Sequence, residues 1–240
     1  MPEPDIEVDA SSVLVAWGTL RLAGPGTLRL TSTELVVNAG AGGSLRARYA
    51  ELRGGGWRTG SLSLHGEPGH VAIQSADGLE HAWVQLLDRV CPLPELARGH
   101  RLLGSRRGGS VDAQARFIAP LLQARRRLED ESDLEARVAA MDARVLRKRI
   151  GSALEAIAKD AFPSSHPDRR GLEAELGEAM TALFAELDAM EAAAAHFRNA
   201  PESIRFVAWR EWVSVVSSAF AVADTGWASA ARLLPGPVRP

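Results

Sequence analysis

The sequence predicts an α+β protein, in which an antiparallel β-barrel closed by a helix precedes an antiparallel bundle of three or four helices. From residue 12 to about 75, apolar residues alternate with polar ones in short runs broken by glycines, which is strand patterning. After residue 111, apolar residues recur every three or four positions, which is helical patterning. We therefore expect a barrel over 11–92, a basic Gly/Arg-rich junction over 93–110 and a helical bundle over 111–235.

The strand region divides into short runs of the length that barrels and sandwiches use. Glycine-containing segments separate the runs, namely GPG, AGAGG, GGG and GEPG, and TST at 31–33 makes a tight reversal. The expected strands are SVLVAWGTLRL, TLRLT, ELVVN, SLRARY, GWRTGSLSLHG and HVAIQS.

Three consecutive glycines, Gly54, Gly55 and Gly56, stand before Trp57. A phosphate-binding loop leads from a strand into a helix N-terminus, whereas these glycines lead into another strand. Glycines in a strand mark a bulge or a bend where a large side chain packs over bare backbone. We expect this architectural role, with Trp57 in the core.

Residues 77–90 form the first expected helix, which Pro92 and Pro94 end, and Trp83 lies on its apolar face. About seven short strands followed by one helix that carries a tryptophan resembles the pleckstrin-homology-like superfamily over residues 11–92. The resemblance implies a barrel of two nearly orthogonal sheets, with Trp83 inserted into the core from the closing helix. Lipid-binding members carry Lys and Arg around the first hairpin loop, where this sequence offers only Arg21 and Arg29.

Three long helices and a shorter one are expected after residue 111. The short helix covers 111–128 and contains Pro120; the first long helix starts at a capping box, Ser132 to Glu135, and runs to about residue 161. Its apolar seam is Leu134, Val138, Met141, Val145, Ile150, Leu154 and Ile157. The second long helix ends near Phe197, and the third begins near Pro201. Alternating gaps of three and four residues predict coiled-coil-like packing between them.

The last helix carries two apolar stripes. The seam residues Trp209, Phe220 and Trp227 are expected in the core. A second stripe contains Trp212, Val215 and Val222, so this helix is either central in the bundle or contacts another subunit through these residues.

Charge is segregated along the chain, although the formal net charge is only −2. Residues 98–127 hold eight arginines and one acid, Asp112, a net charge of +7. This stretch is a candidate for binding an anionic surface. The candidate anion-binding residues are Arg98, Arg101, Arg106, Arg107, Arg125, Arg126 and Arg127. In the alternative interpretation, the last three pair with Glu129, Asp130 and Glu131 four residues further on.

No catalytic constellation, metal site or cofactor motif emerges from the residues. His65 and His70 flank a turn and are two ligands at most, and neighbouring Ser, His and Asp in the loop 163–168 do not form the hydrogen-bonded chain of a triad. The single Cys91 excludes a disulfide framework and a cysteine-based zinc site. We expect neither enzymatic activity nor a cofactor.

The expected function is that of a non-enzymatic protein–protein interaction or scaffold protein, with possible self-association through the last helix. The alternative is a peripheral adaptor that binds an anionic membrane or nucleic acid weakly and salt-sensitively through the basic junction. An acidic N-terminus without basic residues is unlike a secretory signal, and the apolar run 212–223 is shorter than the ~20 residues of a membrane span. We therefore expect a cytoplasmic protein without an integral membrane segment.

Overall fold

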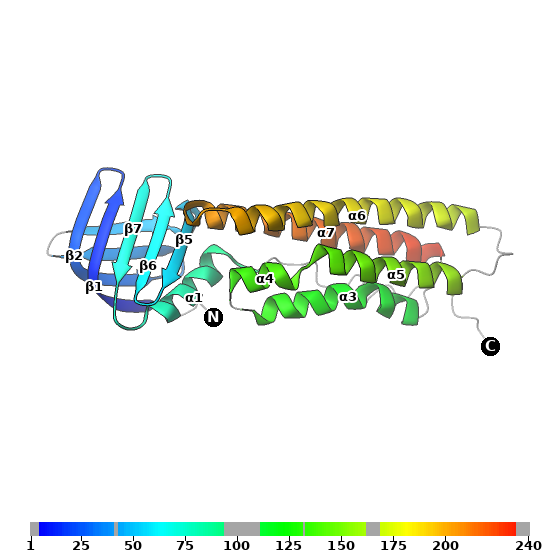
Figure 1. Cartoon of the computed structure of the whole chain (residues 1–240), viewed down its shortest axis with the longest axis horizontal. Coiled ribbons are helices and arrows are strands. Elements are labelled where there is room, and N and C mark those ends of the chain that lie inside the picture. Colours follow the sequence, from blue (N-terminus) through cyan, green and yellow to red (C-terminus); the bar gives the residue numbers. More distant parts are fainter. Residues whose placement is uncertain (1–4, 41–42, 94–110, 132, 162–168, 234–240) are drawn as a thin grey trace. The chain divides into compact units, whose positions relative to one another are not determined.

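The computed structural model describes residues 5–40, 43–93, 111–131, 133–161 and 169–233. The chain is an α+β protein that divides into two compact units. The first unit contains Met1–Leu93 together with Asn199–Glu211, and the second contains Pro94–Arg198 together with Trp212–Pro240. The sequence analysis assigns 199–211 to the helical domain, whereas in the structure this segment belongs with the sheet. Figure 1 labels the elements of both units.

The first unit is built on one antiparallel sheet of seven strands, which agrees with the expected strand region, although two of the six expected runs each contain a turn and divide between two strands. The strand order is β4-β3-β2-β1-β7-β6-β5, so β4 and β5 are its edges. The strands are β1 (Ile6–Trp17), β2 (Leu20–Leu30), β3 (Glu34–Ala39), β4 (Gly43–Arg48), β5 (Leu52–Arg58), β6 (Ser61–Gly66) and β7 (Gly69–Gln74).

The first hairpin differs from the expectation. The turn lies at Gly18, inside the run SVLVAWGTLRL, and the GPG segment that was expected to separate strands lies within β2. The reason is a bulge in β1 between Ala10 and Val13, which pairs with this glycine segment. A bulge bends its strand and increases the local twist, and Gly24, with φ of 131°, adopts the conformation that its partner strand then needs.

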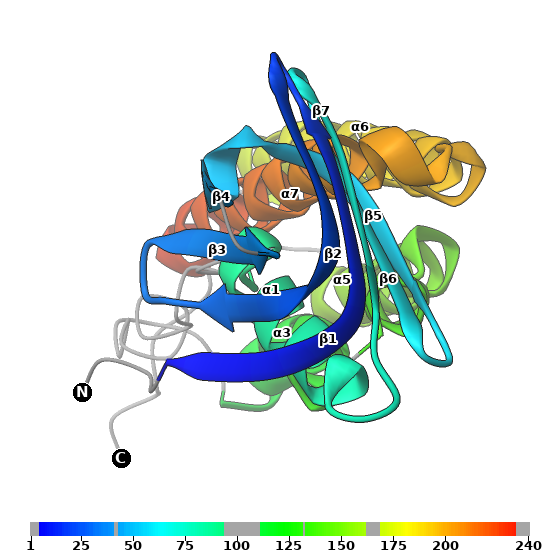
Figure 2. The same ribbon diagram turned by 90° about the vertical axis from the view of Figure 1, so that its left-hand side faces the viewer.

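The sheet curls around the helix α1 (Leu79–Val90), because β1 and β2 bend strongly along their length (Figure 2). Alternate residues of each strand point to the concave side, where they meet the apolar face of α1. The fully buried residues of this core include Leu28, Leu30, Leu35, Val37, Leu52, Leu62, Leu64, Val71, Ile73, Ala82 and Leu86.

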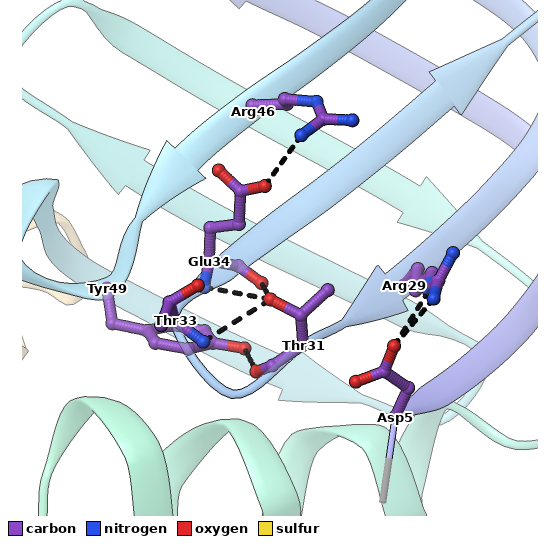
Figure 3. A network of polar contacts seen from close by, with 7 residues as sticks. All are labelled: Asp5, Arg29, Thr31, Thr33, Glu34, Arg46 and Tyr49. Atoms are coloured by element: carbon purple, nitrogen blue, oxygen red, sulfur yellow. Dashed lines mark hydrogen bonds and ion pairs between the residues drawn. The ribbon is translucent and has the colours of Figure 1, made fainter.

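A polar network holds the turn between β2 and β3 (Figure 3). The Thr31 hydroxyl accepts hydrogen bonds from the backbone N–H of Thr33 (3.3 Å) and Glu34 (3.0 Å), which confirms the tight reversal at 31–33. The hydroxyl of Tyr49, the residue that follows β4, donates to the Thr31 carbonyl at 2.6 Å and so ties the end of that strand to this turn. Next to it, hydrogen bonding to Asp5 raises the pKa of Arg29 above its ordinary value.

The triple glycine lies in β5 and is architectural, as expected. The pairing of β5 with β6 shifts register between Leu52 and Gly54, which is the predicted bulge. A Cβ atom on Gly54 would overlap the main chain of the short 3₁₀-helix η2 (Glu202–Ile204), and one on Gly56 would meet the carboxylate of Glu202. The missing side chains therefore allow η2 to lie directly on this strand.

The helices of the second unit begin with α3 (Val111–Asp130), α4 (Leu134–Ala140) and α5 (Ala143–Ala161). The long helix α6 (Arg169–Asn199) belongs to the second unit except for its last residue. The long helix α7 (Arg205–Leu233) begins in the first unit and belongs to the second from Trp212 onward. Helix α3 packs against α4 and α5. Two ion pairs, Arg147–Asp188 and Arg144–Glu191, connect α5 to α6.

The single helix expected over 132–161 is in fact two, α4 and α5. The helix is interrupted at Asp142. The carboxylate of this residue accepts hydrogen bonds from the N–H groups of Arg144 (2.9 Å) and Val145 (3.2 Å) and so starts a new helix. The N-cap of α4 is Asp133, which accepts from the N–H of Ala136 at 3.0 Å; the sequence analysis places this cap one residue earlier.

Two glycine substitutions should change stability in opposite directions. Gly54→Ala should lower the free energy of unfolding by about 1–3 kcal/mol, because the new methyl group overlaps the η2 backbone. Gly177→Ala, at an exposed position of α6 with open space around it, should raise it by about 0.5–1 kcal/mol. Urea unfolding of both variants measures the two shifts. Equal tolerance of both substitutions would contradict the close approach at Gly54.

Trp209→Ala should lower the free energy of unfolding by about 3–5 kcal/mol, because the Trp209 side chain is completely buried. Ser214→Ala, at an exposed position of the same helix, is the control and should change it by less than about 0.5 kcal/mol. Thermal unfolding followed by circular dichroism compares the two. A negligible shift for Trp209→Ala would show that this side chain is not in a packed core.

Candidate partner-binding groove

Two hollows of the second unit lie between α3 and α5. Pro120 occurs in the middle of α3, where it has no N–H to donate and where its ring crowds the carbonyl of the preceding turn. A helix bends or opens at such a position. The facing helix α5 begins at the Asp142 cap, so the side chains that it presents to α3 depend on that break.

Two neighbouring hollows, of about 180 and 670 Å³, lie at this place and share Pro120, Gln123, Val145 and Arg149. We call them together the α3/α5 groove. The remaining described lining residues are Ala119, Ala124, Arg127, Ala139, Ala140, Asp142, Leu146, Lys148 and Ser152.

The floor of the groove is apolar. Ala124 and Leu146 are buried, and Pro120 lies beside them. Val145 is 44 % exposed; it and Leu14 are the large hydrophobic residues that are left exposed in the described part of the chain. The groove thus combines a packed base with an apolar side chain that water contacts.

The rim of the groove is cationic. Arg127, Lys148 and Arg149 are exposed, and Arg149 donates a hydrogen bond to the side chain of Gln123 at 3.1 Å. The one acid among the described lining residues is Asp142, and its carboxylate already accepts the backbone N–H groups that cap α5. The described lining residues therefore carry three cations and one carboxylate, which leaves the groove with a net positive charge.

The candidate anion-binding arginines fall into two groups. Arg98, Arg101, Arg106 and Arg107 lie outside the described residues. In α3, Arg125 pairs with Glu129 at 2.6 Å, which is the local i, i+4 pairing that the sequence allows. Arg126 is exposed, and Arg127 lines the groove.

The candidate interface stripe of the last helix is not an open surface. Trp212 is completely buried within the single chain, and Val215 and Val222 are half-buried. Trp212 is therefore a core residue of this structure.

Two of the five expected core residues are buried. Trp209 and Phe220 are buried, whereas Trp57 and Trp83 are half-buried. The ring of Trp83 lies 6.0 Å from that of Phe206, between centroids. The side chain of Trp227 lies outside the described residues.

His65 and His70 form a cross-strand pair of β6 and β7, as the sequence suggests, with ring centroids 6.4 Å apart. The Glu202 carboxylate lies 3.8 Å from His65 and accepts a hydrogen bond from the Ser63 hydroxyl. No group of three or more His, Cys, Asp or Glu residues is arranged to hold a metal ion among the residues that the structure describes.

No protein-family model, curated protein or solved structure matches this chain.

One helical stretch within the described residues, Glu202–Thr225, has the length and apolar composition that a membrane crossing requires. It is longer than the run 212–223 that the sequence analysis considers. Phe206, Trp209 and Trp212 of this stretch are completely buried in the protein. Core helices of soluble proteins pass the same test of length and composition. Because only one such stretch occurs among the described residues, they do not contain the several spans of a multi-span membrane protein.

The groove contains residues that sequence reasoning missed. Val145 is assigned above to an apolar helix seam, but the break at Asp142 changes the helical phase and leaves this side chain exposed. Lys148 and Arg149 lie outside the basic stretch 98–127. Two features of the sequence could have pointed to the groove, namely Pro120 and the basic triplet 147–149. Neither feature reveals that α3 and α5 lie side by side.

Removing the cap that positions the rim should destabilise the second unit. Asp142→Ala should lower the free energy of unfolding by about 0.5–2 kcal/mol, because two N–H groups of α5 lose their acceptor. Asp142→Asn keeps an oxygen acceptor and should lower it by less. Urea unfolding at neutral pH gives both values. An equal loss for the two variants would argue against a capping role.

Proposed function

We propose that this chain is a non-enzymatic protein-interaction protein, a scaffold that binds an acidic amphipathic helical segment of a partner protein in the α3/α5 groove. The observation that carries the proposal is the combination of an apolar floor, the exposed Val145 and an excess of three exposed cations over one carboxylate among the described lining residues. The same proposal includes a cytoplasmic location.

The architecture that accompanies this function is a pleckstrin-homology-like barrel followed by an antiparallel bundle of three or four helices. The strand order, the curl of the sheet around α1 and the position of Trp83 on that helix support the first part. The ion pairs between α5 and α6 and the packing of α3 on α4 and α5 support the second.

An amphipathic helix fits this groove in a familiar way, since such helices place apolar residues at positions i, i+3, i+4 and i+7 into a hydrophobic channel. Leucine-like side chains would cover Val145 and Pro120. Carboxylates on the flanks would meet Arg127, Lys148 and Arg149. Because these cations are exposed, each ion pair would contribute only about 0.2–1 kcal/mol, and binding would weaken as salt rises.

A second candidate function is that of an adaptor for anionic membranes or nucleic acid. The observation that favours it is the excess of arginine over acid in residues 98–127. Arg126 is exposed, but Arg125 is engaged by Glu129. Such binding would be weak and would fall steeply with salt, without sequence preference.

The test uses a fluorescent peptide of about 18 residues, five helical turns, with leucine on one face and glutamate on the other. Fluorescence anisotropy should detect binding to the full chain. A double variant, Lys148→Glu with Arg149→Glu, should weaken binding about tenfold, and Val145→Glu should do the same. A matched double variant away from the groove, Arg58→Glu with Arg170→Glu, should leave binding unchanged.

Control ligands separate the candidates. A peptide with the same leucines and with lysine in place of glutamate should not bind. Acidic liposomes and duplex DNA, added as competitors, should displace the peptide only weakly. If either competitor binds more tightly than the peptide and is insensitive to the groove variants, the adaptor function replaces the scaffold function.

A further inference from the structure

The segment Asn199–Glu211 belongs to the first unit, although it is far in sequence from the rest of that unit. It joins α6 to α7 and packs on the edge strand β5. Three side chains anchor it, Glu202, Phe206 and Arg210, which follow one another at intervals of four residues. We call the surface that receives it the β5 socket, formed by η1 (Tyr49–Glu51), β5, β6 and α1.

The main-chain contact lies on one face of the edge strand. Gly54 pairs with His65 and Gly56 with Ser63, so these four residues share a face of the sheet. The backbone of η2 lies against Gly54, and the Glu202 carboxylate lies over Gly56, where Ser63 donates a hydrogen bond to it. Any side chain at Gly54 would obstruct this approach.

The aromatic contact lies on the other face. Gly55 pairs with the fully buried Leu64, and a Cβ atom on Gly55 would lie 3.1 Å from the ring of Phe206. Phe206 is completely buried and contacts Trp83 of α1. The segment therefore passes around the edge of the sheet and holds it from both faces.

Arg210 completes the attachment at the start of β5. Its guanidinium donates to the carbonyls of Tyr49 at 3.2 Å and Leu52 at 3.1 Å. Recognition thus uses a carboxylate, a buried aromatic ring and a guanidinium, all supplied by nine consecutive residues.

We propose that the β5 socket is a recognition site for this segment in trans as well as in cis, and that its occupant in trans is the Asn199–Glu211 segment of a second copy of this chain. Every anchoring contact is made by residues inside the segment. The chain leaves the first unit at Leu93 and returns only at Asn199, so no local turn ties the segment to its own socket. Exchange of identical segments between two copies reproduces all of these contacts and closes with two-fold symmetry.

This exchange is independent of the α3/α5 groove, because the groove residues belong to the second unit. It replaces Trp212, Val215 and Val222 as the basis for self-association through the last helix. The wild-type chain should form a dimer whose share increases with protein concentration.

The experiment is complementation between two differently tagged full-length variants. Gly54→Val blocks the socket and leaves the segment intact, whereas Phe206→Ala removes the segment's anchor and leaves the socket intact. Each variant alone should be monomeric by analytical ultracentrifugation. Mixed, they should co-purify as a heterodimer, because the segment of the first fits the socket of the second.

Two controls make this result specific. The double variant, Gly54→Val with Phe206→Ala, offers neither partner surface and should pair with neither single variant. An added peptide with the sequence of Asn199–Glu211 should compete for the open socket and reduce the heterodimer. Folded variants that remain separate monomers on mixing would overturn the proposal, and the segment would then be only a structural part of its own chain.

A milder pair of variants covers the case in which a single variant does not fold. Gly54→Ala then replaces Gly54→Val, and Glu202→Ala with Arg210→Ala replaces Phe206→Ala. Co-expression of the two chains should restore soluble, folded heterodimer. Two chains that stay insoluble together would also overturn the proposal.

Discussion

The contact between the bare backbone of β5 at Gly54 and the main chain of η2 is the constraint on which the first unit depends. It requires glycine at the contact, and it brings Phe206 to Trp83 and Arg210 to the carbonyls of Tyr49 and Leu52. The edge strand β5 is thereby covered by a segment that comes from far along the sequence. An uncovered edge strand would present unpaired N–H and C=O groups to other chains. One short segment therefore completes the core and protects the sheet.

In the second unit, a comparable role belongs to Asp142. Its carboxylate stops one helix and starts the next, and this changes which side chains of α5 face inward. Leu146 and Ile150 are buried, while Val145, Lys148 and Arg149 face water beside Pro120 of α3. The apolar and cationic groove therefore depends on two local features, the helix cap at Asp142 and the proline inside α3.

Local patterns in the sequence predicted the elements that depend on local forces. Period-two alternation predicted an antiparallel strand region but not every turn in it, helical spacing predicted α1, α6 and α7, and the glycines before Trp57 predicted a bulge. The sequence did not reveal what approaches those glycines, because the partner is nearly 150 residues away and makes its contact through main-chain atoms that carry no sequence signal. The same limit explains why the burial of Trp212 and the exposure of Val145 were not predicted. Both lie on apolar stripes, and only the arrangement of the neighbouring helices decides that the first is buried and the second exposed.

The discontinuity of the first unit has a consequence for the order in which the chain folds. Its strands and α1 lie within the first 93 residues and leave the ribosome early, but the segment that covers β5 ends at Glu211. At translation rates of about 5–20 residues per second, the segment Asn199–Glu211 is synthesised on the order of ten seconds after the sheet and α1. During that time the edge of the sheet is open to neighbouring nascent chains on the same messenger RNA. Native closure also requires contacts of high sequence separation, which form slowly. The first unit is therefore complete only after the connection between α6 and α7 has been synthesised.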